Sequence, residues 1–151
     1  MKTKLYAAYG SNTNLGQMAR RCPEAKVVGK GVLDNYRLTF RGKDNGVANI
    51  GACNGRSVPI VLWQITETCE KALDIYEGYP NFYVKKEIEV QTADGAVKAM
   101  AYVMAKRFEK MPAKPNEHYF NIIAKGYAEN GLEQDVLETA YKECLQEVSG
   151  K

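Results

Sequence analysis

The chain has 151 residues, of which 45% are hydrophobic and 26% are charged, and its formal net charge at pH 7 is +3. This length and composition predict one folded domain, residues 1–151, and exclude a disordered protein. Lysines and arginines are scattered among acidic residues, so nucleic acid is not an expected partner.

Runs rich in β-forming residues, bounded by glycine-containing turns, predict about six strands. The dipeptides Asn54-Gly55 and Asp94-Gly95 are typical hairpin turns, while Gly29 and Gly31 favour a bulge or a bend inside a strand. The predicted strands cover residues 2–8, 26–40, 46–52, 57–66, 82–91 and 97–104.

Four segments with apolar residues at helical spacing predict helices. A short helix, capped by Asn12 or Thr13, is expected to close before Pro23. Thr66 and Asn116 are candidate N-caps, and Gly78 and Gly131 are candidate stops, for the two helices that follow. The longer predicted helices cover residues 66–76, 117–130 and 134–148; the proline-containing segment before the second is predicted to be a loop.

The order of these elements indicates the fold class. Most of the predicted strands precede most of the helices, and strand-helix-strand alternations are few. The sequence therefore predicts an α+β protein with a mixed or mainly antiparallel sheet, and the bends in its strands would allow that sheet to curl into a small barrel.

The N-terminal apolar stretch is short, covering only Leu5–Tyr9. The apolar core of a signal peptide has roughly 7 to 15 residues, and a membrane span needs roughly 20. We therefore expect a cytoplasmic protein with no membrane partner.

The four cysteines, Cys22, Cys53, Cys69 and Cys144, are far apart and form no C-x-x-C pair. This spacing argues against a zinc site and against a small disulfide scaffold. Free thiols are predicted, with Cys69 as a small core residue on the apolar face of a helix.

The stretch Tyr6-Ala7-Ala8-Tyr9-Gly10-Ser11-Asn12 is the first candidate site. A strand that ends in a glycine turn before a helix can hold an anion, because a ligand can approach the backbone and successive N–H groups present positive partial charge. Neither the P-loop motif nor G-x-G-x-x-G occurs, so the pattern does not indicate a nucleotide site. A plain strand-to-helix turn is the alternative interpretation.

Glu77 is the second candidate, because a glutamate at a helix C-terminus faces the negative end of the helix dipole. Aromatic residues surround it in the sequence, and desolvation among them would raise the pKa of its carboxyl group into the range of a general base or acid. An exposed glutamate at a helix end is the alternative. The single histidine, His118, is expected on the surface, and no cluster has the spacing of metal ligands, so neither a metal nor a cofactor is predicted.

Taken together, four motifs resemble the γ-glutamylcyclotransferase family, including its AIG2-like relatives. The family pattern Y-x-A-Y-G-S-N matches residues 6–12, L-D-x-x-E-G matches residues 73–78, a Y-x-M strand matches residues 101–104, and I-x-x-G-x-x-E-x-G-L matches residues within 119–132. Tyr83 lies in the strand after the second motif. The motifs occur in the family's order over nearly the whole chain.

The resemblance implies a small β-barrel flanked by helices, and an enzyme that releases 5-oxoproline from a γ-glutamyl compound. It implies that Glu77 is the catalytic residue and that the substrate contacts Tyr6, Ala7, Ala8, Tyr9, Gly10, Ser11, Asn12, Tyr83, Tyr102 and Tyr119. A homodimer is possible, since members of the family can be dimers.

Three functions stay open from the sequence. The chain could act on free γ-glutamyl amino acids, or on another substrate such as a γ-glutamylamine, or it could be a non-catalytic domain that binds an amino-acid-like anion. Glu77 favours an enzyme, because a pure binder of anions gains nothing from a buried carboxylate beside its ligand.

Overall fold

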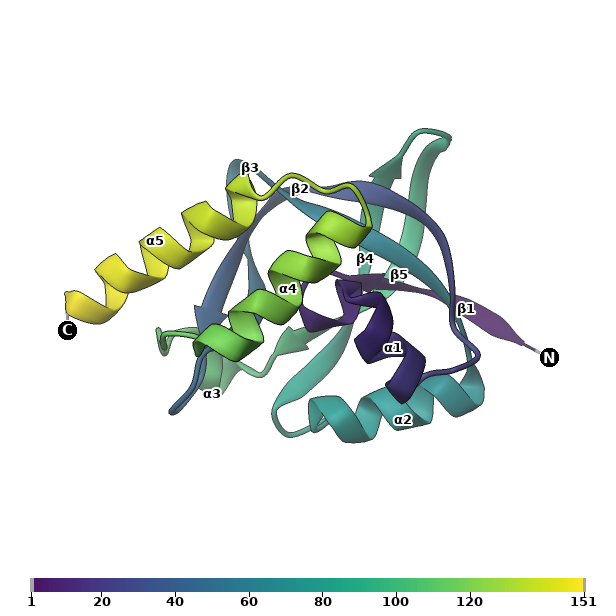
Figure 1. Cartoon of the computed structure of the whole chain (residues 1–151), viewed down its shortest axis with the longest axis horizontal. Helices are drawn as coiled ribbons and strands as arrows, with labels where there is room; N and C mark the ends of the chain where they lie inside the picture. Colours follow the sequence, from purple (N-terminus) through teal and green to yellow (C-terminus); the bar gives the residue numbers. More distant parts are fainter. Residues whose placement is uncertain (1, 151) are drawn as a thin grey trace.

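The computed structural model describes residues 2–150, and five strands in that range form a closed barrel. The strands are β1 (Thr3–Ala8), β2 (Lys26–Arg41), β3 (Val47–Thr66), β4 (Tyr83–Thr92) and β5 (Gly95–Met104). They are ordered β1-β3-β2-β4-β5 around the barrel. All pairings are antiparallel except the closing one, where Tyr6 of β1 pairs in parallel with Met100 of β5. The predicted mixed, mostly antiparallel barrel is confirmed (Figure 1).

The prediction of about six strands is wrong by one, because residues 46–52 and 57–66 belong to the single strand β3. The residues around Asn54-Gly55 form an irregularity rather than a hairpin turn: the pairing of β2 with β3 shifts register between Asp34 and Tyr36. Asn35 supports this irregularity by accepting a hydrogen bond from the Gly55 N–H (3.1 Å). A second shift, between Val27 and Gly29, agrees with the predicted bulge.

The helices begin and end largely at the predicted signals. They are α1 (Leu15–Arg21), α2 (Glu67–Glu77), α3 (Lys106–Glu109), α4 (Glu117–Glu129) and α5 (Asp135–Ser149), with a 3-10 turn η1 at Ser11–Thr13. Thr66 and Asn116 cap α2 and α4 with their side chains, as predicted. Gly78 ends α2 in the left-handed conformation (φ 67°), which a residue without Cβ adopts at little cost.

Two local predictions need correction. The N-cap of α1 is Asn14, whose side chain accepts from the Gln17 N–H, because residues 11–13 form the 3-10 turn η1 instead of the first turn of the α-helix. The short helix α3 lies in the segment predicted to be a loop.

The prediction of free thiols is wrong for Cys22 and Cys69, which form a disulfide across 47 residues of sequence. Cys22 ends α1 and Cys69 lies in the first turn of α2, and the barrel brings these two helices together. The separation in sequence gave no sign of this proximity. Cys69 is buried, as predicted, and Cys53 keeps a free thiol.

Two apolar clusters lie on the two faces of β1. One contains Ala7 and Tyr9 and packs inside the barrel against Ile123 and Tyr127 of α4 and Leu137 of α5. The other contains Tyr6 and Ala8 and packs against α1 and α2. Figure 1 shows α4 and α5 running across one side of the barrel, while α1 and α2 lie together near its edge.

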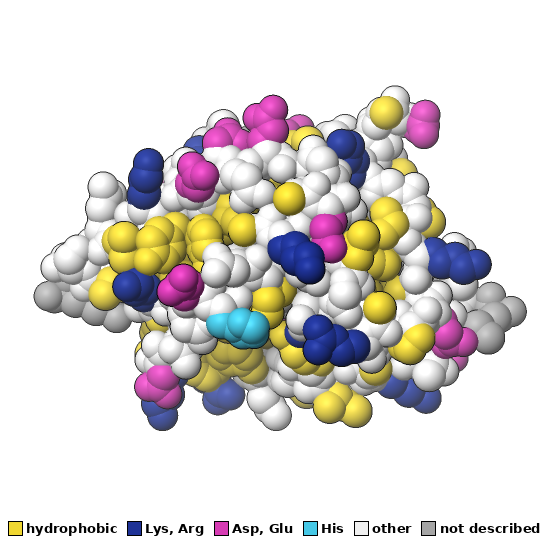
Figure 2. Space-filling model, in the orientation of Figure 1, with side chains coloured by type: hydrophobic (Ala, Val, Ile, Leu, Met, Phe, Trp, Pro, Cys, Tyr) yellow, Lys and Arg dark blue, Asp and Glu magenta, His cyan; other side chains and the backbone are white. Residues whose placement is uncertain are grey.

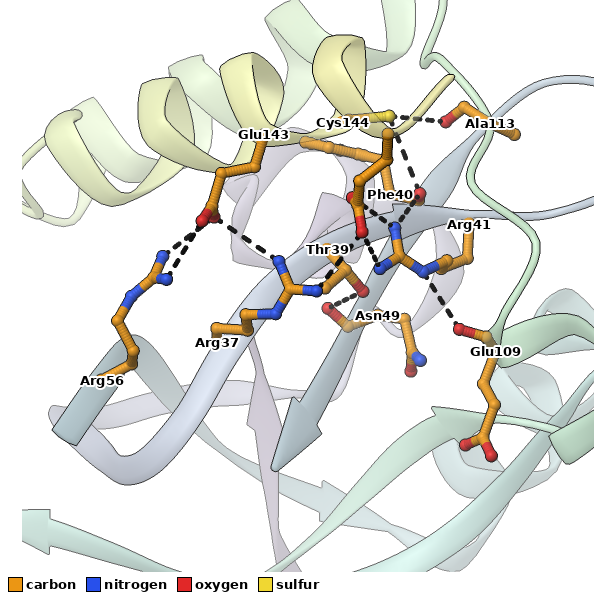
Figure 3. A network of polar contacts seen from close by, with 11 residues as sticks. Arg37, Thr39, Phe40, Arg41, Asn49, Arg56, Glu109, Ala113, Glu143 and Cys144 are labelled. Carbon is orange, nitrogen blue, oxygen red and sulfur yellow. Dashed lines mark hydrogen bonds and ion pairs between the residues drawn. The ribbon is translucent and has the colours of Figure 1, made fainter. Parts of the chain in front are cut away.

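Ion pairs fasten α5 to β2 and β3 (Figure 3). Glu147 pairs with the buried Arg41 (2.9 Å) and with Arg37 (3.4 Å), and Glu143 pairs with Arg56 (2.9 Å). Arg41 also donates to the carbonyl oxygens of Phe40 and Glu109, so its guanidinium is well satisfied although little of it reaches water.

The surface carries both charge signs. On the face seen in Figure 2, basic and acidic side chains are interspersed, and the exposed His118 lies near the start of α4. No helix within residues 2–150 has the length and apolar character needed to cross a bilayer.

Candidate active site

A cavity of about 220 Å³ opens where the end of β1, the turn η1 and the end of α2 meet. Strand β3 contributes Val47 and Ala48, and the loop before β4 contributes Phe82. Among the residues predicted from sequence, those that line it are Tyr6, Tyr9, Gly10, Ser11, Asn12, Glu77, Tyr83, Tyr102 and Tyr119. The fold therefore brings residues 6–12 and Glu77, which are about half the chain apart in sequence, to one cavity.

Ala7 and Ala8 do not line the cavity. Ala7 is fully buried in the cluster inside the barrel, and Ala8 is buried in the cluster that faces α1 and α2. Both are small residues of a strand whose side chains alternate between two packed faces. The structure thus assigns them to the support of the loop and does not bring them into the cavity.

The loop after β1 is held from several directions. The Thr13 N–H donates to the Gly10 carbonyl oxygen (3.0 Å), and the Asn12 carbonyl oxygen accepts from Nε1 of Trp63 (3.0 Å). A Cβ at Gly10 would approach the Cβ of Ala48 to 2.9 Å, so the loop lies directly against β3. The first N–H groups of such a turn have no hydrogen-bond partner within the turn. The hydrogen bonds that close this turn come from the N–H groups of Thr13 and Asn14, so those of Ser11 and Asn12 take no part in closing it.

Glu77 is the last residue of α2, and its side chain is half-buried among aromatic rings. Desolvation raises the pKa of its carboxyl group from the ordinary value of 4.5 to about 7, and the positive charge of Arg21 opposes this rise. Its closest hydrogen-bond donor is Asn12 Nδ2, 3.4 Å from Glu77 Oε1; the same amide nitrogen donates to the hydroxyl oxygen of Tyr6 (2.9 Å).

The tyrosine hydroxyls of the wall are engaged by the protein. Tyr9 donates to the Tyr102 carbonyl oxygen (2.6 Å), Tyr83 donates to the Ala48 carbonyl oxygen (2.6 Å), and Tyr119 accepts from the Ala48 N–H (2.9 Å). Burial raises the pKa of each of these three tyrosines above its ordinary value. These three tyrosines are therefore neutral at pH 7, and among the described residues Glu77 is the one with a carboxyl group that lines the cavity.

Besides the lining residues Val47, Ala48, Tyr76 and Phe82, two charged contributors to the site are absent from the sequence prediction. Arg21, at the end of α1, donates to Asn12 and stacks on Tyr76. Asp74, one turn before Glu77 on α2, accepts from the Tyr102 hydroxyl (2.5 Å) and pairs with Lys85 (3.0 Å). Asp74 lies in the L-D-x-x-E-G motif, one helical turn from Glu77, and this position could have predicted its place at the site. Nothing in the local sequence distinguishes Arg21 from Arg20, so Arg21 could not have been predicted.

No group of three or more His, Cys, Asp or Glu side chains that could hold a metal ion occurs in the part of the chain that the structure describes. The groups available for chemistry in the cavity are therefore one carboxyl with a raised pKa, backbone N–H groups at a tight turn, and fixed tyrosine hydroxyls.

Comparisons with known proteins show which family and which solved structures the chain is similar to. The family model described as "Gamma-glutamyl cyclotransferase, AIG2-like" matches residues 6–122, which include the loop and Glu77. A mouse protein named γ-glutamylcyclotransferase is 33% identical over 147 residues, covering 91% of this chain and 77% of the mouse protein. A human protein of the same name is 33% identical over 138 residues, covering 85% of this chain and 72% of the human protein.

Solved structures match over nearly the whole chain. One named γ-glutamyl cyclotransferase superposes with a TM-score of 0.81 at 30% identity, covering 92% of this chain and 86% of the other. YkqA from Bacillus subtilis superposes with a TM-score of 0.76 at 20% identity, covering 95% of this chain and 55% of that one, and supports the fold alone.

Proposed function

This chain belongs to the γ-glutamyl cyclotransferase, AIG2-like family, and on that premise we propose which reaction its cavity carries out and how. The enzyme cyclises the γ-glutamyl group of a γ-glutamyl amino acid or amine to 5-oxoproline and releases the free amine. The observation that carries the proposal is that the Glu77 carboxyl and the bend at Gly10 open onto one cavity.

Glu77 acts as the proton shuttle in this proposal. Its carboxylate takes a proton from the α-ammonium group of the substrate, and the α-amine then attacks the γ-carbonyl carbon to close a five-membered ring. As the bond to the leaving nitrogen breaks, Glu77 returns the proton to that nitrogen, so one group serves first as base and then as acid. The ring nitrogen keeps two hydrogens after its attack, and it loses the second one through Glu77 to the departing amine, which leaves as an ammonium ion.

The raised pKa of Glu77 lowers the free-energy cost of the first proton transfer. Between an ordinary glutamate, with a pKa of about 4.3, and an α-ammonium group, with a pKa of about 8, the transfer costs roughly 5 kcal/mol. With the pKa of Glu77 at about 7, the remaining gap of about one unit costs about 1.4 kcal/mol. Burial of the carboxyl thus brings the pKa of Glu77 close to the pKa of the α-ammonium group from which it takes the proton.

The loop 9–12 binds the α-carboxylate of the glutamyl group through backbone N–H groups. This contact orients a flexible chain so that the amine meets its own carbonyl, an effect that can be worth several kcal/mol because nucleophile and electrophile share one molecule. The tyrosines Tyr6, Tyr9, Tyr83 and Tyr119 are neutral at pH 7, which leaves Glu77 as the group that accepts the proton.

The test is Glu77→Gln, which keeps the size of the side chain and removes its basicity. We expect release of 5-oxoproline to fall by at least 100-fold, the lower end of the usual contribution of general acid-base catalysis, with the fold intact by circular dichroism. The matched control is Glu89→Gln, an exposed glutamate on β4, which should leave activity unchanged. A fully active Glu77→Gln enzyme would refute the role of Glu77.

A substrate panel separates the open alternatives. Incubation with γ-glutamyl dipeptides, γ-glutamyl-lysine and glutathione, with 5-oxoproline as the measured product, identifies the leaving group. Absence of product from every compound, with binding still measurable by calorimetry, would favour a non-catalytic binding domain.

A homodimer and a cytoplasmic location stay predictions. Light scattering of the purified chain tests the first, and imaging of the tagged protein in its own cells tests the second.

A further inference from the structure

Arg21 joins the two segments that carry the proposed chemistry. Its Nη1 donates to Asn12 Oδ1 in the loop after β1 and lies 3.5 Å from Ser11 Oγ. On the other side its guanidinium carbon lies 3.6 Å from the centre of the Tyr76 ring, next to Glu77 on α2. A cation in this position over an aromatic face is attracted by the ring.

The guanidinium is itself held in place. Its Nη2 donates to Gln17 Oε1 (2.6 Å), one turn earlier on α1, and the side chain is half-buried. The planar fork of an arginine can make these contacts at the same time, whereas a lysine ammonium cannot reproduce them.

The contact with Arg21 decides which way the Asn12 amide faces. Since Oδ1 accepts from Arg21, the amide nitrogen Nδ2 is turned toward the Tyr6 hydroxyl and the Glu77 carboxyl. The flipped amide would direct its oxygen at a carboxylate and its N–H groups at a cation, and both contacts would be repulsive. Arg21 therefore fixes the donor that faces the proposed base.

The other groups that face Glu77 are tyrosine hydroxyls from four elements and one loop. They come from β1 (Tyr6), the loop after it (Tyr9), α2 (Tyr76), β4 (Tyr83) and α4 (Tyr119). Burial raises the pKa of Tyr6, Tyr9, Tyr83 and Tyr119, so these four are neutral at pH 7. Among the described residues Arg21 is the cation that acts on the Glu77 carboxyl, and it lowers the pKa that burial raises.

We propose that Arg21 is a positioning residue of the reaction: it orients the Asn12 amide toward Glu77 and stabilises the charged form of the Glu77 carboxyl. This inference rests on the proposed function, in which the charged form of Glu77 accepts the first proton.

The test is the pH dependence of kcat/KM in Arg21→Met, which removes the charge and the donors and keeps the apolar stem. The acid limb is expected near pH 7 in the natural enzyme and up to roughly one unit higher in the variant. A shift of one unit lowers activity at pH 7 about fivefold and restores it by about pH 9, because Glu77 is then ionised in both proteins. A purely structural loss would not recover at high pH.

Two further variants and one replacement variant complete the test. Arg20→Met removes the same charge from an exposed position in the same helical turn and should leave the limb near pH 7. Arg21→Lys keeps the charge but not the fork, so we expect an unmoved limb together with a lower plateau rate. Arg21→Gln replaces Arg21→Met if that variant does not fold. An uncharged variant that folds and keeps its limb near pH 7 overturns the proposal.

Direct titration of the Glu77 carboxyl by NMR, without substrate, separates this inference from the proposed function. If Glu77→Gln is inactive but Arg21→Met leaves the titration of Glu77 unmoved, the inference about Arg21 fails and the function stands. If Glu77→Gln is active, the proposed function fails, and the titration still shows whether Arg21 acts on Glu77.

Discussion

At the scale of single residues, Glu77 illustrates how one environment serves chemistry at the expense of stability. Burial raises the pKa of its carboxyl from 4.5 to about 7. At a pH between these two pKa values, the Glu77 carboxyl keeps a proton in the folded protein and releases it in the unfolded chain. The contribution of Glu77 to the free energy of unfolding is therefore most favourable below about pH 4.5 and is lost as the pH rises through about 7.

We predict that Glu77→Gln is more stable than the natural protein at neutral pH, although it is inactive. The difference in free energy of unfolding should grow by roughly 3 kcal/mol between pH 4.5 and 8, at about 1.36 kcal/mol per unit of pKa shift. Urea unfolding at several pH values measures it, with Glu89→Gln as the control. A difference that does not change with pH would mean that Glu77 is not desolvated in solution.

At the scale of elements, the loop after β1 depends on how closely α4 approaches it. A Cβ at Gly126 would overlap Thr13 Oγ1 and lie 2.6 Å from the backbone nitrogen of Asn14, so only glycine allows this contact. Asn130, the residue after α4, then donates through Nδ2 to the Thr13 carbonyl oxygen (2.8 Å), and Asn14 Nδ2 donates to the Ile122 carbonyl oxygen (3.0 Å). Helix α4 therefore packs against the loop that is proposed to bind the substrate and holds it in place.

Gly126→Ala should therefore weaken both stability and substrate binding. Separating α4 from the turn is expected to cost about 1 to 3 kcal/mol of unfolding free energy, and the displaced loop should raise KM. Thermal unfolding and steady-state kinetics measure the two effects. Gly51→Ala, where an added Cβ meets nothing within 4 Å, is the control and should change neither.

At the scale of the whole molecule, the barrel is closed by long-range pairing and braced by α5 on a side away from the cavity. Arg41 is 7% exposed in its side chain, and its ion pair with Glu147 joins the last helix to β2 (Figure 3). Arg56 and Glu143 form a second pair, with exposed fractions of 37% and 30%. The two pairs have the same N–O distance of 2.9 Å, but water screens the pair of Arg56 more than the pair of Arg41.

We predict that Glu147→Gln costs roughly 2 to 4 kcal/mol of unfolding free energy, because it leaves the charge of Arg41 buried without its partner. Arg56→Gln should cost less than about 1 kcal/mol, as is typical of exposed pairs. Chemical denaturation measures both. Comparable losses in the two variants would contradict this distinction, and neither residue lines the cavity, so both enzymes should stay active at temperatures where they are folded.

The sequence by itself determined the local features of this protein and its family. The caps Thr66 and Asn116 and the stop at Gly78 follow from interactions within a few residues, which any local segment encodes. The family resemblance as a whole identified nine of the thirteen described residues that line the cavity, six of them in the motif around Gly10 and the motif containing Glu77.

Only the tertiary structure decided which distant groups meet. The continuity of β3, the disulfide between Cys22 and Cys69, and the contact of Arg21 with Asn12 and Tyr76 depend on strand pairing and helix packing across tens of residues. Such contacts leave no periodic signal in the sequence, because the local pattern around each residue is the same whether or not its distant partner is nearby. The pKa of Glu77 belongs to the same class: Tyr76, Phe82 and Tyr83 lie near it in sequence, but β1, β5 and α4 supply the other rings, and only the fold brings them together.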